Sequence, residues 1–268
     1  HNLLGMARAR AGDAAKARAS YEQAIKLDAG FVDPQLNLAR LEIAARQYDA
    51  AVARLNGILK SDEKHVPTLI EAGQLLGLRG QTDEGARLLT RAADLSTQPA
   101  DLDAGLALFE FHLRGGRYGP AQEAAKALST KAPEDIAVLL ANARVAMATN
   151  NAEAANAALV KATRAAGFDA QQLTKIALLQ LGTGDAKAAA YSLTKALQAA
   201  PNHLPAEALM VDADIRQRDF DAADKRARGI VARHPKLAVG HSLLGDLAKA
   251  RGLWPQSVEA YRRAYQLE

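Results

Sequence analysis

A period of 34 residues runs through the whole chain and constrains its fold more than any other feature. The steps between successive members of one aligned column are 34, 34, 36, 34, 34, 34 and 34 residues. The members of this first column are Gly5, Ala39, Gly73, Phe109, Ala143, Ala177, Val211 and Gly245. A second column holds only Ala, Gly or Ser, at Ala17, Ala51, Gly85, Ala121, Ala155, Ala189, Ala223 and Ser257. A third column stays in phase at Ala24, Ile58, Ala92, Leu128, Ala162, Ala196, Ile230 and Ala264. Such a period indicates a repeat architecture in which each unit packs on its neighbours.

Within each repeat, apolar residues follow two helical patterns on either side of a short break. In the second repeat, Leu36, Ala39 and Ile43 lie on one side of a first helix. Leu55 and Ile58 do the same on a second helix. The breaks are polar or contain glycine, at Gly12-Asp13, Arg46-Gln47, Gly80-Gln81, Gly115-Gly116, Asn150-Asn151, Gly184-Asp185, Arg218-Asp219 and Arg251-Gly252. Glycine ends a helix in the left-handed conformation, and Asp or Asn caps the next one.

We therefore predict an all-α solenoid made of about eight helix–turn–helix repeats in a single array. The repeats are expected at approximately 1–31, 32–65, 66–101, 102–135, 136–169, 170–203, 204–237 and 238–268. The small residues of the columns let paired helices approach closely, and a larger or charged side chain there would push them apart. Phe109 departs from this pattern just after the 36-residue step. We expect the two extra residues within Ser96–Asp101, with a locally altered packing angle.

Several short motifs resemble those of the tetratricopeptide repeat (TPR) family. The first repeat carries Leu4-Gly5 followed by Ala17-x3-Tyr21, and the last carries Leu244-Gly245 followed by Ser257-x3-Tyr261. His1 and His241 stand where the family usually has Trp. The resemblance covers essentially the whole chain, and it implies a right-handed superhelix. In that arrangement the first helices line the concave face.

The same resemblance implies that a segment of a partner protein binds in the concave groove. The groove positions are mainly aliphatic with isolated charges: Leu36, Arg40, Ile43, Gln74, Leu106, Glu110, Leu140, Arg144, Met147, Leu178, Asp212 and Asp246. Further positions on the same helix faces are Asp33, Ile70, Leu113, Arg114, Thr174, Leu181, Ala208, Ile215, Arg216, Ser242 and Lys249. Arg40 and Arg144 are expected to pair with carboxylates of the partner. Some family members bind the C-terminal carboxylate of a partner with a basic residue and an Asn at set groove positions. That combination is missing here, which favours an extended or helical apolar segment as the bound partner.

The sequence offers no candidate catalytic or metal-binding set. It has no cysteine, which excludes disulfides, thiolate metal sites and cysteine nucleophiles. Its six histidines form no His-x3-His pair, and no nucleophile elbow or phosphate-binding loop is present. The net charge of +4 comes from interleaved acids and bases, and aromatic residues make up only 4%, so nucleic acid is not an expected partner. We therefore expect a non-enzymatic scaffold without a cofactor.

A narrower resemblance suggests a cellular setting. The stretch Leu36–Leu41, and His234-Pro235 followed by Gly240 and Leu244-Gly245-Asp246, are similar to TPR-repeat lipoproteins of PEP-CTERM systems. That similarity implies a Gram-negative envelope protein, periplasmic or outer-membrane-associated, in exopolysaccharide export or protein sorting. Any lipid-bearing cysteine would lie outside this sequence, which we interpret as a fragment, and a cytoplasmic location stays open.

Two other function classes stay open. The array could be the regulatory arm of a larger enzyme such as a glycosyltransferase. Direct carbohydrate or nucleic-acid binding is the third class, which the scarcity of aromatics disfavours. Apolar residues near the two ends, Leu3, Leu4, Tyr261 and Tyr265, further predict some self-association, since terminal repeats normally need polar caps.

Overall fold

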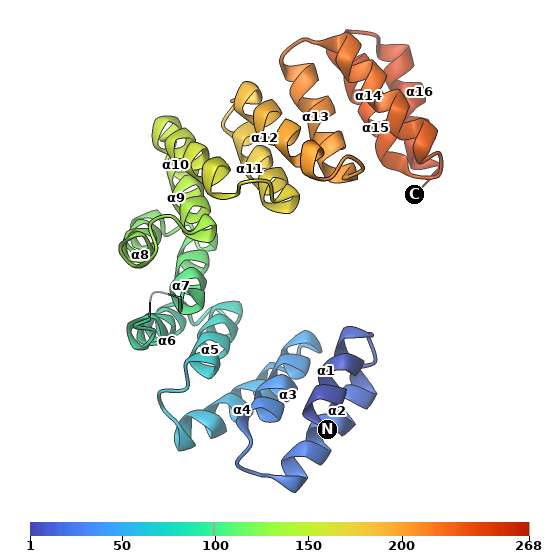
Figure 1. The fold of residues 1–268 in the computed structure, drawn as a ribbon. Coiled ribbons are helices and arrows are strands. Elements are labelled where there is room, and N and C mark those ends of the chain that lie inside the picture. The colour runs from blue at the N-terminus through green and yellow to red at the C-terminus, as the bar shows by residue number, and fades with distance from the viewer. Residues whose placement is uncertain (99, 268) are drawn as a thin grey trace. The chain divides into compact units, whose positions relative to one another are not determined.

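The computed structural model describes residues 1–98 and 100–267, and these residues form sixteen α-helices and no strand (Figure 1). The first eight helices are α1 (Asn2–Arg10), α2 (Ala14–Leu27), α3 (Val32–Ala44), α4 (Tyr48–Ser61), α5 (Val66–Leu78), α6 (Thr82–Leu95), α7 (Asp103–Arg114) and α8 (Tyr118–Lys131). The other eight are α9 (Ile136–Ala148), α10 (Ala152–Ala165), α11 (Ala170–Gly182), α12 (Ala186–Ala199), α13 (Leu204–Arg216), α14 (Phe220–Arg233), α15 (Ala238–Ala250) and α16 (Trp254–Tyr265). The predicted all-α helical solenoid is confirmed.

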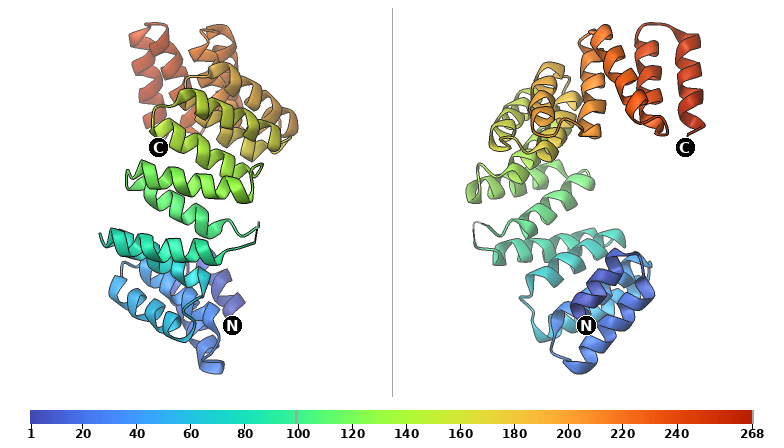
Figure 2. Two further views of the ribbon diagram at one scale, coloured as in Figure 1. Left: turned by 90° about the vertical axis from the view of Figure 1, so that its left-hand side faces the viewer. Right: turned by 45° about the vertical axis from the view of Figure 1, so that its right-hand side comes forward.

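The helices belong to two compact units, His1–Ala132 and Pro133–Glu268. Helices α1 to α8 form the first unit and α9 to α16 the second. Within each unit, an odd-numbered first helix packs beside the even-numbered second helix that follows it (Figure 2). A single array of eight repeats and a right-handed superhelix stay predictions. Among the described residues, no helix combines the length and the apolar character that a bilayer crossing needs.

The three sequence columns form the core between the helices. Every member of the three columns is buried, as their recurrence at the helix contacts predicts. Where a column holds glycine, a partner side chain fills the space: Tyr21 lies over Gly5, and Tyr261 lies over Gly245. Phe109, the exception by size, is also completely buried. The columns therefore mark the seams along which helices pack.

In each repeat, the turn after the first helix contains a residue in the left-handed conformation. Each of the eight turns contains one residue with positive φ, and three of these residues are not glycine: Arg46 (φ 59°), Asn150 (φ 56°) and Arg218 (φ 63°). Four second helices also have a side-chain cap that accepts the backbone N–H three residues on, from Asp13, Asn151, Asp185 and Asp219. The predicted breaks are therefore helix ends, even where the left-handed residue is arginine.

One polar contact recurs between the paired helices at a separation of 12 residues. It joins Glu42 to Arg54 (Oε1 to Nη2, 2.8 Å) in the second repeat and Asp214 to Arg226 (Oδ2 to Nε, 2.8 Å) in the seventh. Arg8 donates to Ser20 (2.7 Å), and Ser192 donates to Gln180 (2.9 Å), at the same register. In the third repeat, this register holds two leucines, Leu76 and Leu88. The register therefore accepts either a polar or an apolar pair.

The connection between α6 and α7 is longer than the other connections between repeats. It covers residues 96–102, whereas its counterparts, such as 62–65 and 132–135, have four residues. The two extra residues were predicted here, and Pro99, inside this stretch, lies outside the described residues. The Lys131 Nζ atom of α8 donates to the Ser96 carbonyl at 2.6 Å and ties the connection to the core. This connection borders the candidate functional site.

Candidate partner-binding cleft

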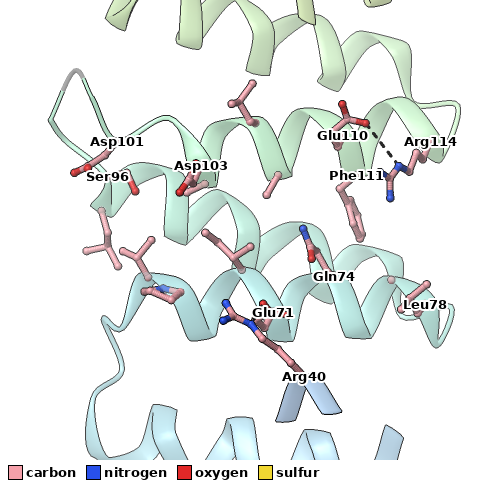
Figure 3. A pocket seen from close by; sticks show the side chains of 18 of the residues that line it. Arg40, Glu71, Gln74, Leu78, Ser96, Asp101, Asp103, Glu110, Phe111 and Arg114 are labelled. Carbon is pink, nitrogen blue, oxygen red and sulfur yellow. Dashed lines mark hydrogen bonds and ion pairs between the residues drawn. The ribbon is translucent and has the colours of Figure 1, made fainter. Parts of the chain in front are cut away.

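A cleft of about 1080 Å³ lies between the first helices α5 and α7 in the first unit (Figure 3). Its walls come from these two helices, from Thr82 and Leu95 of α6, and from the connection that follows α6. Arg40 of α3 reaches one side of it. We call this space the α5–α7 cleft.

Six of the predicted groove positions line the α5–α7 cleft. They are Arg40, Ile70, Gln74, Leu106, Glu110 and Arg114. All except Arg40 project from the first helices of the third and fourth repeats, as the family resemblance implied. These six positions, which the family resemblance implied, therefore lie around one cleft, and their role in partner binding stays a prediction.

Much of the cleft lining is apolar. Val66, Pro67 and Ile70 of α5 face it together with Leu106 and Phe111 of α7. The lining also includes Leu78, Leu95, Ala104 and Ala107. Apolar side chains that line a concave space favour the apolar side chains of a partner.

The Phe111 side chain forms part of the wall because two glycines leave room for its ring. A methyl group added to Gly77 would overlap the Phe111 ring, and one added to Gly85 would lie 3.0 Å from its Cζ atom. The Arg117 guanidinium carbon lies 5.0 Å from the centroid of the same ring. The ring is therefore held in the space beside Gly77 and Gly85 and by a cation–π contact with Arg117.

Charged groups at the cleft are paired in one part and unpaired in another. Arg40 donates to Glu71 (Nε to Oε1, 2.6 Å), and Arg114 lies beside Glu110 (Nε to Oε2, 3.6 Å). Asp101 and Asp103 lie toward the other end, near Ser96 (Figure 3). Arg40 already has a carboxylate partner within the protein, and its pairing with a carboxylate of a bound segment stays a prediction. Arg144 also interacts within the protein.

Several predicted groove residues contribute to the core instead of to an open surface. Leu36 is only 4% exposed and packs with Ala39 and Leu55. Thr174 and Leu181 are buried as well. Leu36 matches a groove position of the family by its helix register, but its side chain packs against α4, the second helix of its own repeat. It offers little surface to a partner.

The remaining aliphatic positions have different exposures. Ile43 and Leu140 are half-buried and pack against core clusters. Met147 is also half-buried, with its Cε atom close to Gly182 of α11. Leu178 is 56% exposed. These residues do not line the α5–α7 cleft.

The two acidic positions predicted in the later repeats have partners inside the protein. Asp212 accepts from Arg216 (Oδ1 to Nε, 2.9 Å), and Arg216 also donates to the Leu181 carbonyl at 2.9 Å. Asp246 accepts from the Tyr261 hydroxyl at 2.7 Å, and this hydrogen bond is the main reason that the pKa of Tyr261 is raised. Both carboxylates therefore have hydrogen-bond partners within the second unit.

Sequence reasoning missed several cleft residues. Glu71 and Phe111 occupy helix positions next to the mapped ones, and Asp101 and Asp103 belong to the long connection or its edge. The 36-residue step was the available signal, since an enlarged connection next to two first helices changes the local surface. It located the segment but not its carboxylates.

Two side chains with buried nitrogen atoms lie next to the cleft wall, His112 of α7 and Arg117 at the N-cap of α8. The Nδ1 atom of His112 and the Nε and Nη2 atoms of Arg117 are buried without a hydrogen-bond partner. Burial lowers the pKa of His112, and the nearby Arg117 charge lowers it further. Across the described ranges, no three His, Asp or Glu side chains gather as a metal site would require.

Comparisons with known proteins agree with this architecture. The tetratricopeptide repeat family model matches residues 8–71 and 180–247. No curated protein matches the sequence. The type IV pilus biogenesis factor PilW shares the fold with a TM-score of 0.57 and 21% identity, covering 78% of this chain and 96% of PilW.

Two further solved structures are similar to this chain. A tetratricopeptide repeat protein from Parabacteroides merdae has a TM-score of 0.56 and 13% identity, with 96% of each chain covered. PilF of Pseudomonas aeruginosa has a TM-score of 0.55 and 18% identity, covering 78% of this chain and 95% of PilF. The 34-residue period, the helix pairs, the family match and the shared fold together identify the chain as a tetratricopeptide repeat array.

Proposed function

We propose that the protein is a non-enzymatic scaffold that binds an apolar segment of a partner protein in the α5–α7 cleft. The observation that carries this proposal is the cleft itself, about 1080 Å³ in volume and lined by the first helices of adjacent repeats. Ile70, Leu106 and Phe111 give it apolar walls, and Gln74 is an exposed polar group among them. A segment that buries one or two large apolar side chains there gains affinity from their removal from water.

A cleft variant and a matched control test this proposal. Leu106→Glu places a charge in the apolar wall and is expected to weaken capture of the partner by about tenfold or more. Val160→Glu adds the same charge on an exposed position of the second helix α10, outside the cleft and outside the predicted groove positions, and we expect it to leave capture unchanged. Both variants are compared with the wild type in pull-downs from the source organism, followed by binding measurements with the purified partner. Equal loss in both variants, or in neither, would remove the cleft as the binding surface.

We further propose that this scaffold acts in a bacterial envelope, in exopolysaccharide export or protein sorting. The similarity of Leu36–Leu41 and of the His234–Asp246 region to envelope TPR lipoproteins supports the proposal. The fold is also that of PilW, a pilus biogenesis factor. Membrane attachment would come from a lipid anchor outside this sequence. Fractionation of cells that carry the tagged natural protein tests this location, and recovery in the cytoplasmic fraction would contradict it.

Self-association is a second contact that we propose. Helix α16 exposes Trp254 (61%), Val258 (56%), Tyr261 (36%) and Tyr265 (79%), which recur on one helix face. Helix α1 exposes Leu3 (79%) and Leu4 (46%). Contiguous apolar surface of this kind favours association between copies.

A further inference from the structure

The charges at the α5–α7 cleft do not balance. Four carboxylates line it, from Glu71, Asp101, Asp103 and Glu110, against two guanidinium groups, from Arg40 and Arg114. Glu71 and Glu110 have these two guanidinium groups as neighbours. Within the described part of the chain, the carboxylates of Asp101 and Asp103 make no hydrogen bond or ion pair. The residues that line the cleft therefore carry an excess of negative charge toward one end (Figure 3), where the Lys131 Nζ atom donates to the Ser96 carbonyl.

Aspartates in other connections between repeats accept hydrogen bonds from backbone N–H groups, and Asp101 does not. Asp28 accepts from the Gly30 N–H at 3.0 Å, and Asp62 accepts from the Lys64 N–H at 3.0 Å. Asp135 and Asp169 cap α9 and α11 in the same way. The longer connection before α7 leaves the Asp101 side chain without such an amide. Its acceptor capacity is free for a ligand.

The Asp103 carboxylate has a structural role at the start of α7, but this role does not explain the second carboxylate, that of Asp101. Asp103 lies in the first turn of α7, where a negative charge is stabilised by the helix dipole. That role does not use its hydrogen-bonding capacity, since no donor in the described residues reaches it. Asp101 precedes the helix and gains less from the dipole. Together they form an acidic end next to apolar residues such as Val66, Pro67 and Leu95.

We propose that the α5–α7 cleft selects a partner segment in which an arginine or lysine accompanies large apolar side chains. The basic group binds Asp101 and Asp103, and its aliphatic stem lies along the apolar wall. The neighbouring apolar side chain occupies the space beside Leu106 and Phe111. This inference rests on the proposed function, because it names the chemistry of the segment that the cleft would hold. A C-terminal acidic tail is disfavoured by the same charges.

Synthetic peptides provide the direct test. The probes are fluorescent peptides with an arginine at varied spacing from a Leu-Phe pair, and matched sets with Gln or Glu in place of the arginine. Fluorescence anisotropy is recorded with the whole protein at low and high salt. We expect the best arginine peptide to bind about tenfold more tightly than its Gln counterpart at low salt. Salt should reduce the difference because both carboxylates are exposed.

Protein variants assign the preference to the two aspartates. Asp101→Asn with Asp103→Asn is expected to remove the difference between the arginine and Gln peptides while leaving the binding of the Gln peptide in place. Asp94→Asn is the matched control, an exposed aspartate of α6 outside the cleft. Circular dichroism checks that each variant is folded. An unchanged preference in the double variant, or equal binding of Glu and arginine peptides, would overturn the inference.

The outcome separates this inference from the proposed function. If Leu106→Glu weakens every peptide and the aspartate variants change nothing, the cleft binds apolar segments without selecting a basic residue. If Leu106→Glu has no effect on any peptide that binds, both the cleft and its charge preference are excluded.

Discussion

Gly85 shows how a single absent side chain determines the packing of the third repeat. Six other members of its column are alanine, so the sequence alone suggests that alanine would fit here too. A Cβ atom at this position would lie 2.6 Å from the Gly73 carbonyl oxygen and 3.0 Å from the Phe111 ring. The backbone of α5 and an aromatic ring therefore occupy the volume that a methyl group needs. The glycine is required by its neighbours, and not by a left-handed turn.

We predict that Gly85→Ala destabilises the protein by about 1–3 kcal/mol, because overpacking outweighs the helix-propensity gain of about 1 kcal/mol. Gly57→Ala is the matched control, since Gly57 lies inside α4 with open space where its Cβ would be. That substitution should stabilise the protein by up to about 1 kcal/mol. Urea denaturation of both variants measures the free energies of unfolding. A similar gain in the free energy of unfolding for both variants would show that the helices around Gly73 and Gly85 shift easily to accommodate a methyl group.

His112 predicts a pH dependence of stability in the first unit. Burial first, and the Arg117 charge second, lower the pKa of His112 from its ordinary 6.5. The unfolded chain therefore takes up a proton at a higher pH than the folded one. The stability contributed by the neutral imidazole is full above about pH 6.5 and is lost as the pH falls toward the lowered pKa.

The measurement is urea denaturation of the wild type and of His112→Leu at neutral pH and at mildly acidic pH. The wild type should lose more free energy of unfolding on acidification than the variant does. Other groups titrate in both proteins, so the difference between the two slopes isolates His112. Equal slopes would mean that folding does not change how readily His112 takes up a proton, which would contradict the lowered pKa.

At the scale of elements, two side chains 12 positions apart, one on the first helix and one on the second, form a contact that holds the two helices of a repeat together. The Glu42 side chain is 3% exposed and has the Arg54 guanidinium as a bidentate partner. A buried carboxylate is costly without such a partner, and the remaining arginine is costly without the carboxylate. The third repeat has Leu76 and Leu88 in the same register. An apolar pair is therefore an equivalent solution.

We predict that Glu42→Gln lowers the free energy of unfolding by about 2–4 kcal/mol, because it removes the buried negative charge that balances the half-buried Arg54 guanidinium and one of its two acceptor oxygens. The double variant Glu42→Leu with Arg54→Leu should return to within about 1 kcal/mol of the wild type. Asp224→Asn breaks the exposed Arg228–Asp224 pair and should cost less than about 1 kcal/mol. Chemical denaturation compares all three. If the double variant is as unstable as Glu42→Gln, the repeat needs the ion pair itself.

The sequence predicts the elements well because their signals are local. The three columns located every helix pair, and the breaks located the turns, including those with left-handed Arg46 and Arg218. Six of the groove positions that the family resemblance implied line one cleft. The Arg40–Glu71 pair could not be predicted, because a contact between neighbouring repeats depends on how their helices pack. The free carboxylate of Asp101 depends likewise on the path of an irregular connection, which has no period.

At the scale of the whole molecule, one position shows what distinguishes the last repeat. Residues equivalent to Tyr261 are at most 2% exposed in all seven earlier repeats: Tyr21, Leu55, Leu89, Ala125, Leu159, Leu193 and Ala227. Tyr21 shares a core cluster with Leu38 of α3, on the first helix of the next repeat. Tyr261 itself is 36% exposed. The face of α16 thus has the form of a surface on which another helix packs.

We therefore predict that this protein associates with itself as its concentration rises, through the α16 face and the exposed leucines of α1. Sedimentation velocity over a wide range of concentrations measures the effect. Val258→Glu with Tyr265→Glu should raise the apparent dissociation constant by about tenfold or more, because both charges would be buried against an apolar partner. Val160→Glu is the matched control, as Val160 is 53% exposed on α10. A wild type that stays monomeric at every concentration would refute the association, and an equal effect of the control would move the contact away from α16.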